Sequence, residues 1–408
     1  MRRTAGTARR GGVMRVVGVL VCAVLVLALM TGVARADGAR IPPVGTWKVE
    51  LYPWSSSDTI DRTIAALPKD LAVLALQDIF LDEDGLKAFR RALWRSYPFS
   101  YHVPPHTLHD LGCVTELPAS TCEALTGLDV TYCVQLLASS LLSCLFSSGF
   151  SLDRVTLDDV FWSSCAPMAS VLLILDPQCN ACLVNAAGEN GGAPEQTFDT
   201  CMAQQGPRHA HGGSVGQLIL SKLPLRDVEV VEFPSYIERR ANVYATIGGV
   251  RYGFASYPYD ILADTGLTAF VPPLPGALQP ALAQEMIDSD ADVLLGSFWS
   301  GTRYQADAYN DLLASFQDLA PGMLTYCTQA MIDAQDPRCV VQTPGGPFLI
   351  RGSPLDLDHV LVRNGSAGCF RSDAPRLFAE NGISDHVGLR VCKKVFEPGT
   401  FPSGGILR

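Results

Sequence analysis

The chain has 408 residues, with 31 Lys and Arg against 41 Asp and Glu, and its formal net charge at pH 7 is −10. An acidic chain repels polyanions, and no long stretch here supplies the basic footprint that nucleic-acid binding requires. Nucleic acid is therefore not an expected partner.

Residues 1–36 are typical of a secretory signal peptide. Five of the first fifteen residues are arginine, an apolar run follows at 16–29, and Ala34-Arg35-Ala36 forms a small-residue cleavage site. The apolar run is short for a membrane span, and Val21 rather than a small residue precedes Cys22. We expect a secreted or periplasmic protein, residues 37–408, with no transmembrane segment or lipid anchor. It keeps 25 basic and 41 acidic residues, a net charge of −16.

Twelve of the thirteen cysteines lie outside this segment, an even number that predicts disulfides in an exported chain. Cys179 and Cys182 have the spacing of a redox motif or a metal knuckle, but no second pair at metal spacing accompanies them, so structural bridges are favoured. Two bridges are predicted across loops between neighbouring elements: Cys327–Cys339 and Cys369–Cys392.

The mature chain opens with strands and helices in alternation. Residues 46–51 alternate like a strand, a capped helix is expected at 57–67, and 71–76 is an apolar run typical of a buried strand. In residues 84–95 the apolar side chains recur at helical spacing, which predicts a second helix. Residues 99–103 alternate between apolar and polar, which predicts another strand.

Between about 106 and 212 the chain becomes Cys-rich, with eight of the twelve mature cysteines and an expected helix at 133–146. A loop of this length without structure of its own is improbable, so we expect a disulfide-stapled insertion that projects from the main fold.

Strand patterns return after the insertion, with a Gly248-Gly249 hairpin turn among them, and helices are expected at 278–289 and 306–316. The expected strands are 216–221, 227–233, 242–247, 250–256, 293–297 and 355–362. This order predicts an α/β fold in which two mostly antiparallel sheets form a β-sandwich flanked by helices, a four-layer arrangement with the Cys-rich insertion attached.

Near the C-terminus, Asp358 lies in an apolar alternating strand, and Ser384-Asp385-His386 begins another strand. Two carboxylates and an imidazole at one sheet edge form a hydrolytic layout, because a carboxylate beside His386 would fix its tautomer and raise its basicity as a general base. Asp-His pairs also occur as ordinary hydrogen-bonded groups, which is the competing interpretation.

The order of motifs resembles the endonuclease/exonuclease/phosphatase superfamily, which includes secreted deoxyribonucleases and sphingomyelinases. The matching segments are Leu74-Ala75-Leu76-Gln77-Asp78, the glycine-led strand 212–225, Arg239-Arg240-Ala241, Leu295-Gly296-Ser297-Phe298-Trp299, and the strands of Asp358 and Asp385-His386. The resemblance spans most of the mature chain outside the insertion. It implies a divalent-metal-dependent phosphodiesterase fold, with Mg²⁺ or another divalent cation as cofactor if the chain is active and otherwise none.

The departures from the superfamily pattern fall on its chemical residues, so this chain would be a divergent member. They are Pro53 or a neighbour in place of the first-strand Asn, Asp78 for the metal Glu, Ser256-Tyr257 for Thr-His, and Ser297 and Trp299 for the Asp and Asn of Gly-Asp-x-Asn. Asp358, Asp385 and His386 survive as a catalytic remnant, with Asp78 as a weakened metal ligand. Losing a positioned acid or base costs about 10² to 10⁴ in rate, and losing one oxyanion donor about 10² to 10³.

His209 and His211 flank Ala210 beside a Gly-rich segment. Two histidines on one side of a strand are able to recruit a metal, but the sequence places no third ligand, so a solvated loop is favoured.

Three functions from different classes remain open. We favour a non-catalytic binding protein, a pseudoenzyme with a degenerate site and a phosphoester or lipid-headgroup ligand. The alternative is an active divalent-metal phosphodiesterase of nuclease or sphingomyelinase type. A structural surface protein that interacts through the insertion is the third.

Overall fold

The computed structural model describes part of the chain. The described residues are 39–53, 55–113, 177–189, 194–233, 239–257, 278–298, 300–302, 306–327, 341–343, 346–348, 356–365, 367–369, 375–379, 384 and 386–392. The predicted signal peptide, the predicted helix at 133–146, Trp299 and Asp385 lie outside them. In the described part, no helix is both long and apolar enough to cross a membrane.

Two six-stranded sheets form the body of the protein. The first has the order β17 (Arg376–Phe378), β18 (Gly388–Val391), β2 (Val44–Leu51), β3 (Val73–Ile79), β7 (Leu218–Ser221) and β4 (Phe99–His102). The second has the order β12 (Phe316–Asp318), β15 (Asp358–Arg363), β11 (Val293–Ser297), β10 (Val250–Ser256), β9 (Arg240–Ile247) and β8 (Leu225–Phe233). Within these sheets only β2 with β3 and β10 with β11 pair in parallel. The predicted two-sheet, mostly antiparallel α/β fold is confirmed.

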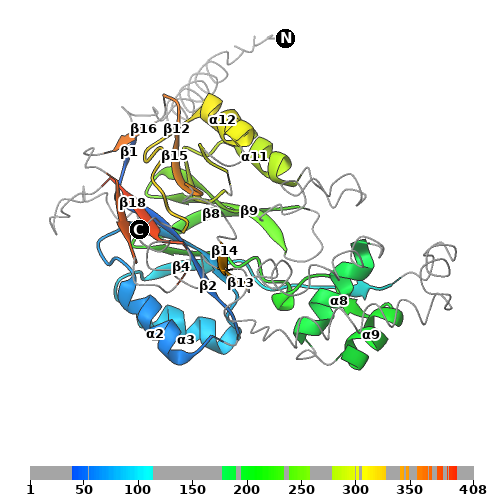
Figure 1. Ribbon diagram of the computed structural model, residues 1–408. Coiled ribbons are helices and arrows are strands. Elements are labelled where there is room, and N and C mark those ends of the chain that lie inside the picture. Colours follow the sequence, from blue (N-terminus) through cyan, green and yellow to red (C-terminus); the bar gives the residue numbers. More distant parts are fainter. Residues whose placement is uncertain are drawn as a thin grey trace, which may run out of the picture.

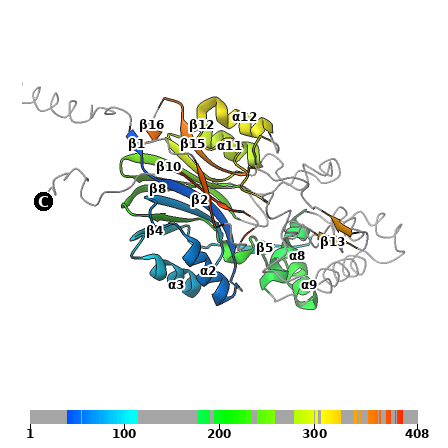
Figure 2. The ribbon, with the colours of Figure 1, turned by 60° about the vertical axis from the view of Figure 1, so that its left-hand side comes forward.

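The two sheets pack face to face around an apolar core to which Val73 and Ile219 contribute from the first sheet and Val243 and Phe254 from the second. Helices α2 (Ser57–Ala66) and α3 (Glu83–Leu93) cover the outer face of the first sheet, and α11 (Leu278–Asp288) and α12 (Ala306–Ser315) cover that of the second. Figures 1 and 2 show the resulting four layers.

Local sequence explains where the first two helices begin. Ser56 caps α2 by accepting a hydrogen bond from the main-chain N of Thr59, and Asp82 caps α3 through the N of Gly85 at 2.7 Å. Side-chain oxygens at these positions satisfy amides that have no partner within the helix.

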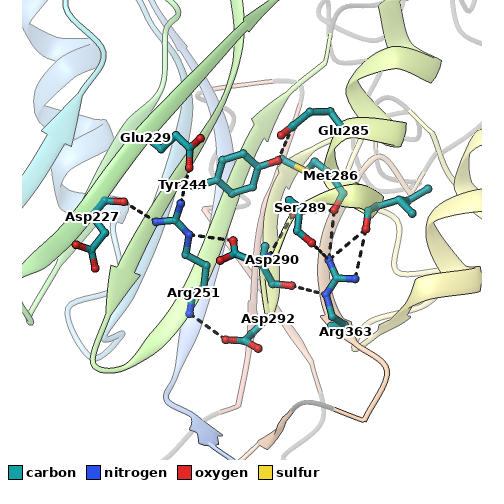
Figure 3. A network of polar contacts seen from close by, with 12 residues as sticks. Asp227, Glu229, Tyr244, Arg251, Glu285, Met286, Ser289, Asp290, Asp292 and Arg363 are labelled. Carbon is teal, nitrogen blue, oxygen red and sulfur yellow. Dashed lines mark hydrogen bonds and ion pairs between the residues drawn. The ribbon is translucent and has the colours of Figure 1, made fainter. Parts of the chain in front are cut away.

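Arg363 fixes the end of α11 to the second sheet (Figure 3). Its guanidinium donates to the main-chain oxygens of Ser289 at 2.6 Å, Ala291 at 2.7 Å and Ile287 at 3.4 Å. Carbonyls at a helix C-terminus lack intrahelical donors and favour a nearby cation, so this contact ties helix and sheet together. In the same region Arg251 pairs with Glu229 at 2.8 Å and lies 5.6 Å from the Tyr244 ring centre.

The described ends of the Cys-rich insertion form a lobe beside the sandwich (Figure 1). It consists of β5 (His109–Leu111), α8 (Pro177–Glu189), α9 (Pro194–Met202), β6 (Gly206–Pro207) and the 3₁₀ helix η2 (His211–Gly213). Among the described residues of the insertion, the disulfides are Cys113–Cys179 and Cys182–Cys201, which lie in a small apolar core. Cys179 and Cys182 thus belong to two different bridges, and the structural interpretation of this motif is confirmed.

Two further cysteines, Cys327 and Cys392, are disulfide-bonded. Their partners stay a prediction. The remaining short strands are β1 (Ala39–Ile41), which pairs with β16 (Ala367–Cys369), and β13 (Val341–Thr343), which pairs with β14 (Gly346–Phe348).

Candidate functional site

The inner core ends in polar residues at one end of the sandwich. Ser256 pairs with Ser297, and Ser297 pairs with Asp358, so the three lie at the same level on adjacent strands of the second sheet. Each is two residues from an apolar side chain of the inner core, and side chains two apart in a strand share a face. The sheet therefore presents a row of hydroxyl, hydroxyl and carboxylate where the apolar packing stops.

His386 reaches this row from the first sheet. Its Nδ1 lies 2.6 Å from Asp358 Oδ2, and both side chains are buried. Trp47 Nε1 donates to the His386 carbonyl at 3.0 Å, while the His386 main-chain N donates to Ser384 Oγ at 3.1 Å. Burial alone would raise the pKa of Asp358, but the charge of His386 and its hydrogen bond hold that pKa below its usual value. The predicted proximity of Asp358 and His386 is thus observed, in the geometry of an oriented base.

Asp78 enters the same region through an unusual backbone. Its φ is 58°, and that of Glu50 on the neighbouring strand is 62°. Left-handed conformations are uncommon outside glycine, and Asp is one of the residues that tolerate them best. Asp78 Oδ1 accepts a hydrogen bond at 3.2 Å from Ser256 Oγ, which belongs to the opposite sheet. The strained backbone thus directs this carboxylate across the end of the sandwich.

Lys48 is the site residue that the sequence analysis missed. Its Nζ lies 3.3 Å from Asp78 Oδ2 and 3.4 Å from Glu50 Oε1. Pro53, named for the substituted first-strand position, is exposed instead. The available signal was the alternation of Thr46-Trp47-Lys48-Val49, which turns the lysine away from the outer core that holds Trp47 and Val49.

Arg240 adds a second cation. Its Nη1 lies 3.2 Å from the Ser256 carbonyl oxygen, to which it donates, and 3.4 Å from Ser256 Oγ. Burial alone would raise the pKa of Asp78, but Lys48 and then Arg240 hold that pKa below its usual value. Asp78 is therefore an ionised carboxylate compensated by two side-chain cations of the protein itself.

The residues here do not fit a divalent cation. Ser256 engages Asp78 Oδ1 and Lys48 faces Oδ2, so a metal would have to displace an ammonium. Among the described residues, no group of three or more His, Cys, Asp or Glu side chains has the arrangement of a metal site. Magnesium needs near-octahedral oxygen ligation. Asp78, whose side chain is shorter than the Glu it replaces, does not supply that ligation.

His211 lies close to Asp78 but is not arranged as a ligand. Its ring stacks on Phe80 with centroids 4.3 Å apart and lies 5.4 Å from Tyr52. Burial lowers its pKa to about 4, although the charge of Asp78 opposes the shift, so the ring is neutral at pH 7. His209 lies in a loop and His211 begins η2, so the favoured loop interpretation holds for His209 and the alternative of a shared strand does not, but both side chains are partly buried and not fully solvated as expected.

Tyr257, one of the substituted positions, lies behind the site. Its ring packs edge-on against Phe298 in the outer core beneath α11 and α12. Burial raises the pKa of this hydroxyl well above its usual value. Of the predicted site residues, the structure thus brings together Asp78, Ser297, Asp358 and His386.

A second Asp-His pair lies on the other face of β15. His359 Nδ1 is 2.8 Å from Asp318 Oδ2, and its Nε2 donates to the Ser300 carbonyl at 2.7 Å. Tyr309 donates to Asp318 at 2.7 Å. Burial alone would lower the pKa of His359, but Asp318 raises it above its usual value, and His359 helps to lower the pKa of Asp318. Both ring nitrogens have partners, so we assign this pair a structural role.

No known family model matches the sequence, and no curated protein matches it either. Among solved structures, the chain is similar to sphingomyelinase C from Streptomyces griseocarneus, at 12% identity and a TM-score of 0.39, over 86% of this chain and 99% of that one. It is also similar to an endonuclease/exonuclease/phosphatase family protein from Leptotrichia buccalis, at 11% identity and a TM-score of 0.38, over 86% and 98%.

A 3′-5′ exonuclease from Neisseria meningitidis gives 14% identity and a TM-score of 0.37, over 86% and 98%. Of these three structures, the one from Leptotrichia buccalis is described as a member of the superfamily that the sequence motifs resemble. Because these TM-scores are below 0.5, the similarity carries no argument about function.

Proposed function

We propose that this chain is an exported, non-catalytic binding protein whose hydrolytic site has become an internal ion-pair network. One observation carries the proposal: the Lys48 ammonium lies between Asp78 and Glu50, at 3.3 and 3.4 Å. An ammonium in this position supplies positive charge to the carboxylate without any open coordination position for a substrate oxygen.

Burial supports the same conclusion. The side chains of Lys48 and Asp78 are 9% and 7% exposed, and Ser297, Asp358 and His386 are also buried. In a buried ion pair each charge is stabilised by the other. Removing one member leaves an uncompensated buried charge, at a cost of about 3–5 kcal/mol. Exchange of this ammonium for a metal ion is therefore unfavourable.

The ligand that we propose is a phosphoester or a lipid headgroup. Arg240 supplies a guanidinium at this end of the sandwich, and charge-assisted hydrogen bonds to phosphate are strong. Ser297 Oγ is buried without a hydrogen-bond partner among the described residues. The serine hydroxyl is able to donate to a phosphoryl oxygen.

The test is hydrolysis of bis(p-nitrophenyl) phosphate with Mg²⁺, Mn²⁺ or Ca²⁺, compared between the wild-type protein and His386→Ala. We expect the same background rate for both. Calorimetric titration with phosphocholine is the binding arm, and we expect heat that Arg240→Met abolishes. A metal-dependent rate that His386→Ala removes would refute the non-catalytic assignment, whereas absence of binding would refute only the ligand class.

An active divalent-metal phosphodiesterase is the second candidate, and the Asp358–His386 pair at 2.6 Å favours it. This geometry fixes the imidazole as a general base requires. Under this alternative, the rate depends on both the added metal and His386, and Asp78→Ala removes the metal dependence.

A further inference from the structure

A groove of about 640 Å³ lies between the C-terminal half of α3, the strand β4 and the edge of β8, and none of the site residues lines it. We call it the α3 groove. Lys87, Arg90, Arg91 and Trp94 line it from the helix. Phe99 and Tyr101 line it from β4, and Leu225 and Val228 from β8.

The helix wall is basic in an acidic protein. Lys87, Arg90 and Arg91 are exposed, and none of them forms an ion pair with any residue that the structure describes. Arg90 Nε donates to Ser100 Oγ at 2.8 Å, which holds its guanidinium over the groove. Cations in the last turn of a helix interact favourably with the helix dipole. That interaction explains neither the groove nor the aromatic side chains beside these cations.

Exposed apolar side chains gather at the same place. Trp94 is 63% exposed, Phe99 38% and Val228 36%. Across the described residues, four large hydrophobic side chains are this exposed, and only Leu108 lies outside the groove. An apolar cluster beside polar groups at the surface is typical of an interaction site.

Edge strands of both sheets also line the groove. Among the described strands, β4 is the last of the first sheet, and β8 is the last of the second. An edge strand has unpaired main-chain donors and acceptors on one side, which an extended peptide is able to use by adding as a further strand. β8 carries Asp227 and Glu229, so a negatively charged peptide would be repelled there and attracted to the side of β4 and α3.

We propose that the α3 groove binds an extended acidic segment of a partner protein. Its main chain pairs with β4, its carboxylates face Lys87, Arg90 and Arg91, and an aromatic or aliphatic side chain packs on Trp94 and Phe99. The concave shape favours a peptide over the plane of a membrane, which would meet a flat or convex surface. This proposal is independent of the function of the buried site.

The probe is a fluorescein-labelled peptide in which glutamate alternates with valine and phenylalanine, followed by fluorescence anisotropy with the full-length protein. Arg90→Glu combined with Arg91→Glu should weaken binding at least about tenfold, and Trp94→Ala by a similar factor, because aromatic and arginine anchors dominate such interfaces. Affinity should fall as NaCl is raised from about 50 to about 300 mM, since exposed charges are screened.

Arg376→Glu is the matched control. Arg376 is an exposed arginine on β17, the strand at the opposite end of the same sheet. This variant reverses one arginine charge outside the groove, half the charge change of the double variant, and should bind normally. A peptide with glutamine in place of glutamate should bind at least about tenfold more weakly, and N-methylation of alternate amides should abolish binding if the peptide adds as a strand. Unchanged melting temperatures separate these effects from misfolding.

Absence of peptide binding, equal binding of the glutamine peptide, or equal weakening by Arg376→Glu would overturn the proposal. The protein is also mixed with vesicles of phosphatidylcholine and phosphatidylglycerol. If Arg90→Glu with Arg91→Glu abolishes vesicle binding while the acidic peptide does not bind, the groove recognises an anionic membrane and the peptide proposal is wrong.

Discussion

Replacing Lys48 with methionine tests whether an internal cation has taken the place of a metal. The substitution shortens the side chain by one atom and removes its charge, which leaves Asp78 Oδ2 and Glu50 Oε1 without the ammonium at 3.3 and 3.4 Å. Since Asp78 is nearly inaccessible to water, screening is weak, and we expect a loss of about 3–5 kcal/mol in the free energy of unfolding. Urea denaturation measures this loss directly.

A double-mutant cycle isolates the pair. Asp78→Asn removes the charge that Lys48 compensates, so Lys48→Met should cost much less in that background, with a coupling energy of about 1–3 kcal/mol. Additive effects of the two substitutions would refute the ion-pair interpretation.

Metal titration gives the complementary result. Thermal unfolding of the wild-type protein should barely respond to about 1 mM Mg²⁺ or Mn²⁺, because an ion near its dissociation constant adds only about 0.4 kcal/mol. Lys48→Asn removes the competing ammonium and adds an amide oxygen, so its melting temperature should rise with the metal. A wild-type shift of several degrees, abolished by Asp78→Ala but unchanged when His209 and His211 are replaced, would show that the carboxylate still holds an ion.

The pair of Asp318 and His359 should give a bell-shaped contribution to stability. The contribution of Asp318 to the free energy of unfolding is complete above pH 3.8, its unfolded pKa, and is lost as the pH falls through its lower folded pKa. The contribution of His359 is complete below pH 6.5, its unfolded pKa, and is lost as the pH rises through its raised folded pKa. The difference in unfolding free energy between the wild type and His359→Gln should therefore be largest between pH 3.8 and 6.5, and a difference that keeps growing toward alkaline pH would contradict this assignment. Arg363→Met should cost about 1–3 kcal/mol because it leaves carbonyls at the end of α11 without their donor; Arg363→Lys, which keeps the charge but not the fork of donors, should recover only part of that stability in the same denaturation assay.

The strand alternation of the sequence was sufficient to predict the two-sheet sandwich and the part of the site formed by Ser297 and Asp358. Both faces of β11 and β15 are buried: Leu295 and Val360 face the inner core, and Leu294 and Leu361 face the outer core. The period of two then places Ser297 and Asp358 at the end of the inner face. The meeting of Asp358 with His386 followed from the same alternation together with the family resemblance.

Lys48 and the position of Asp78 could not be predicted in the same way. Alternation places Lys48 on the inner face, but only the left-handed backbone of Asp78 brings the carboxylate to it, and a single φ value has no signature in the sequence. Helices α8 and α9 were missed for a different reason: disulfides hold them in a small core, so their sequences need little amphipathic pattern.

The bridge between Cys113 and Cys179 has a consequence for how this protein is able to vary. The two Cα atoms are 4.2 Å apart although 66 positions separate them in the chain. The entropy of closing a loop grows only with the logarithm of its length, so the intervening segment can be lengthened, shortened or exchanged while its two anchors stay in place. The bridge therefore keeps Cys113 and Cys179 side by side whatever the number of residues between them, so the length of the segment is not constrained by the position of its ends.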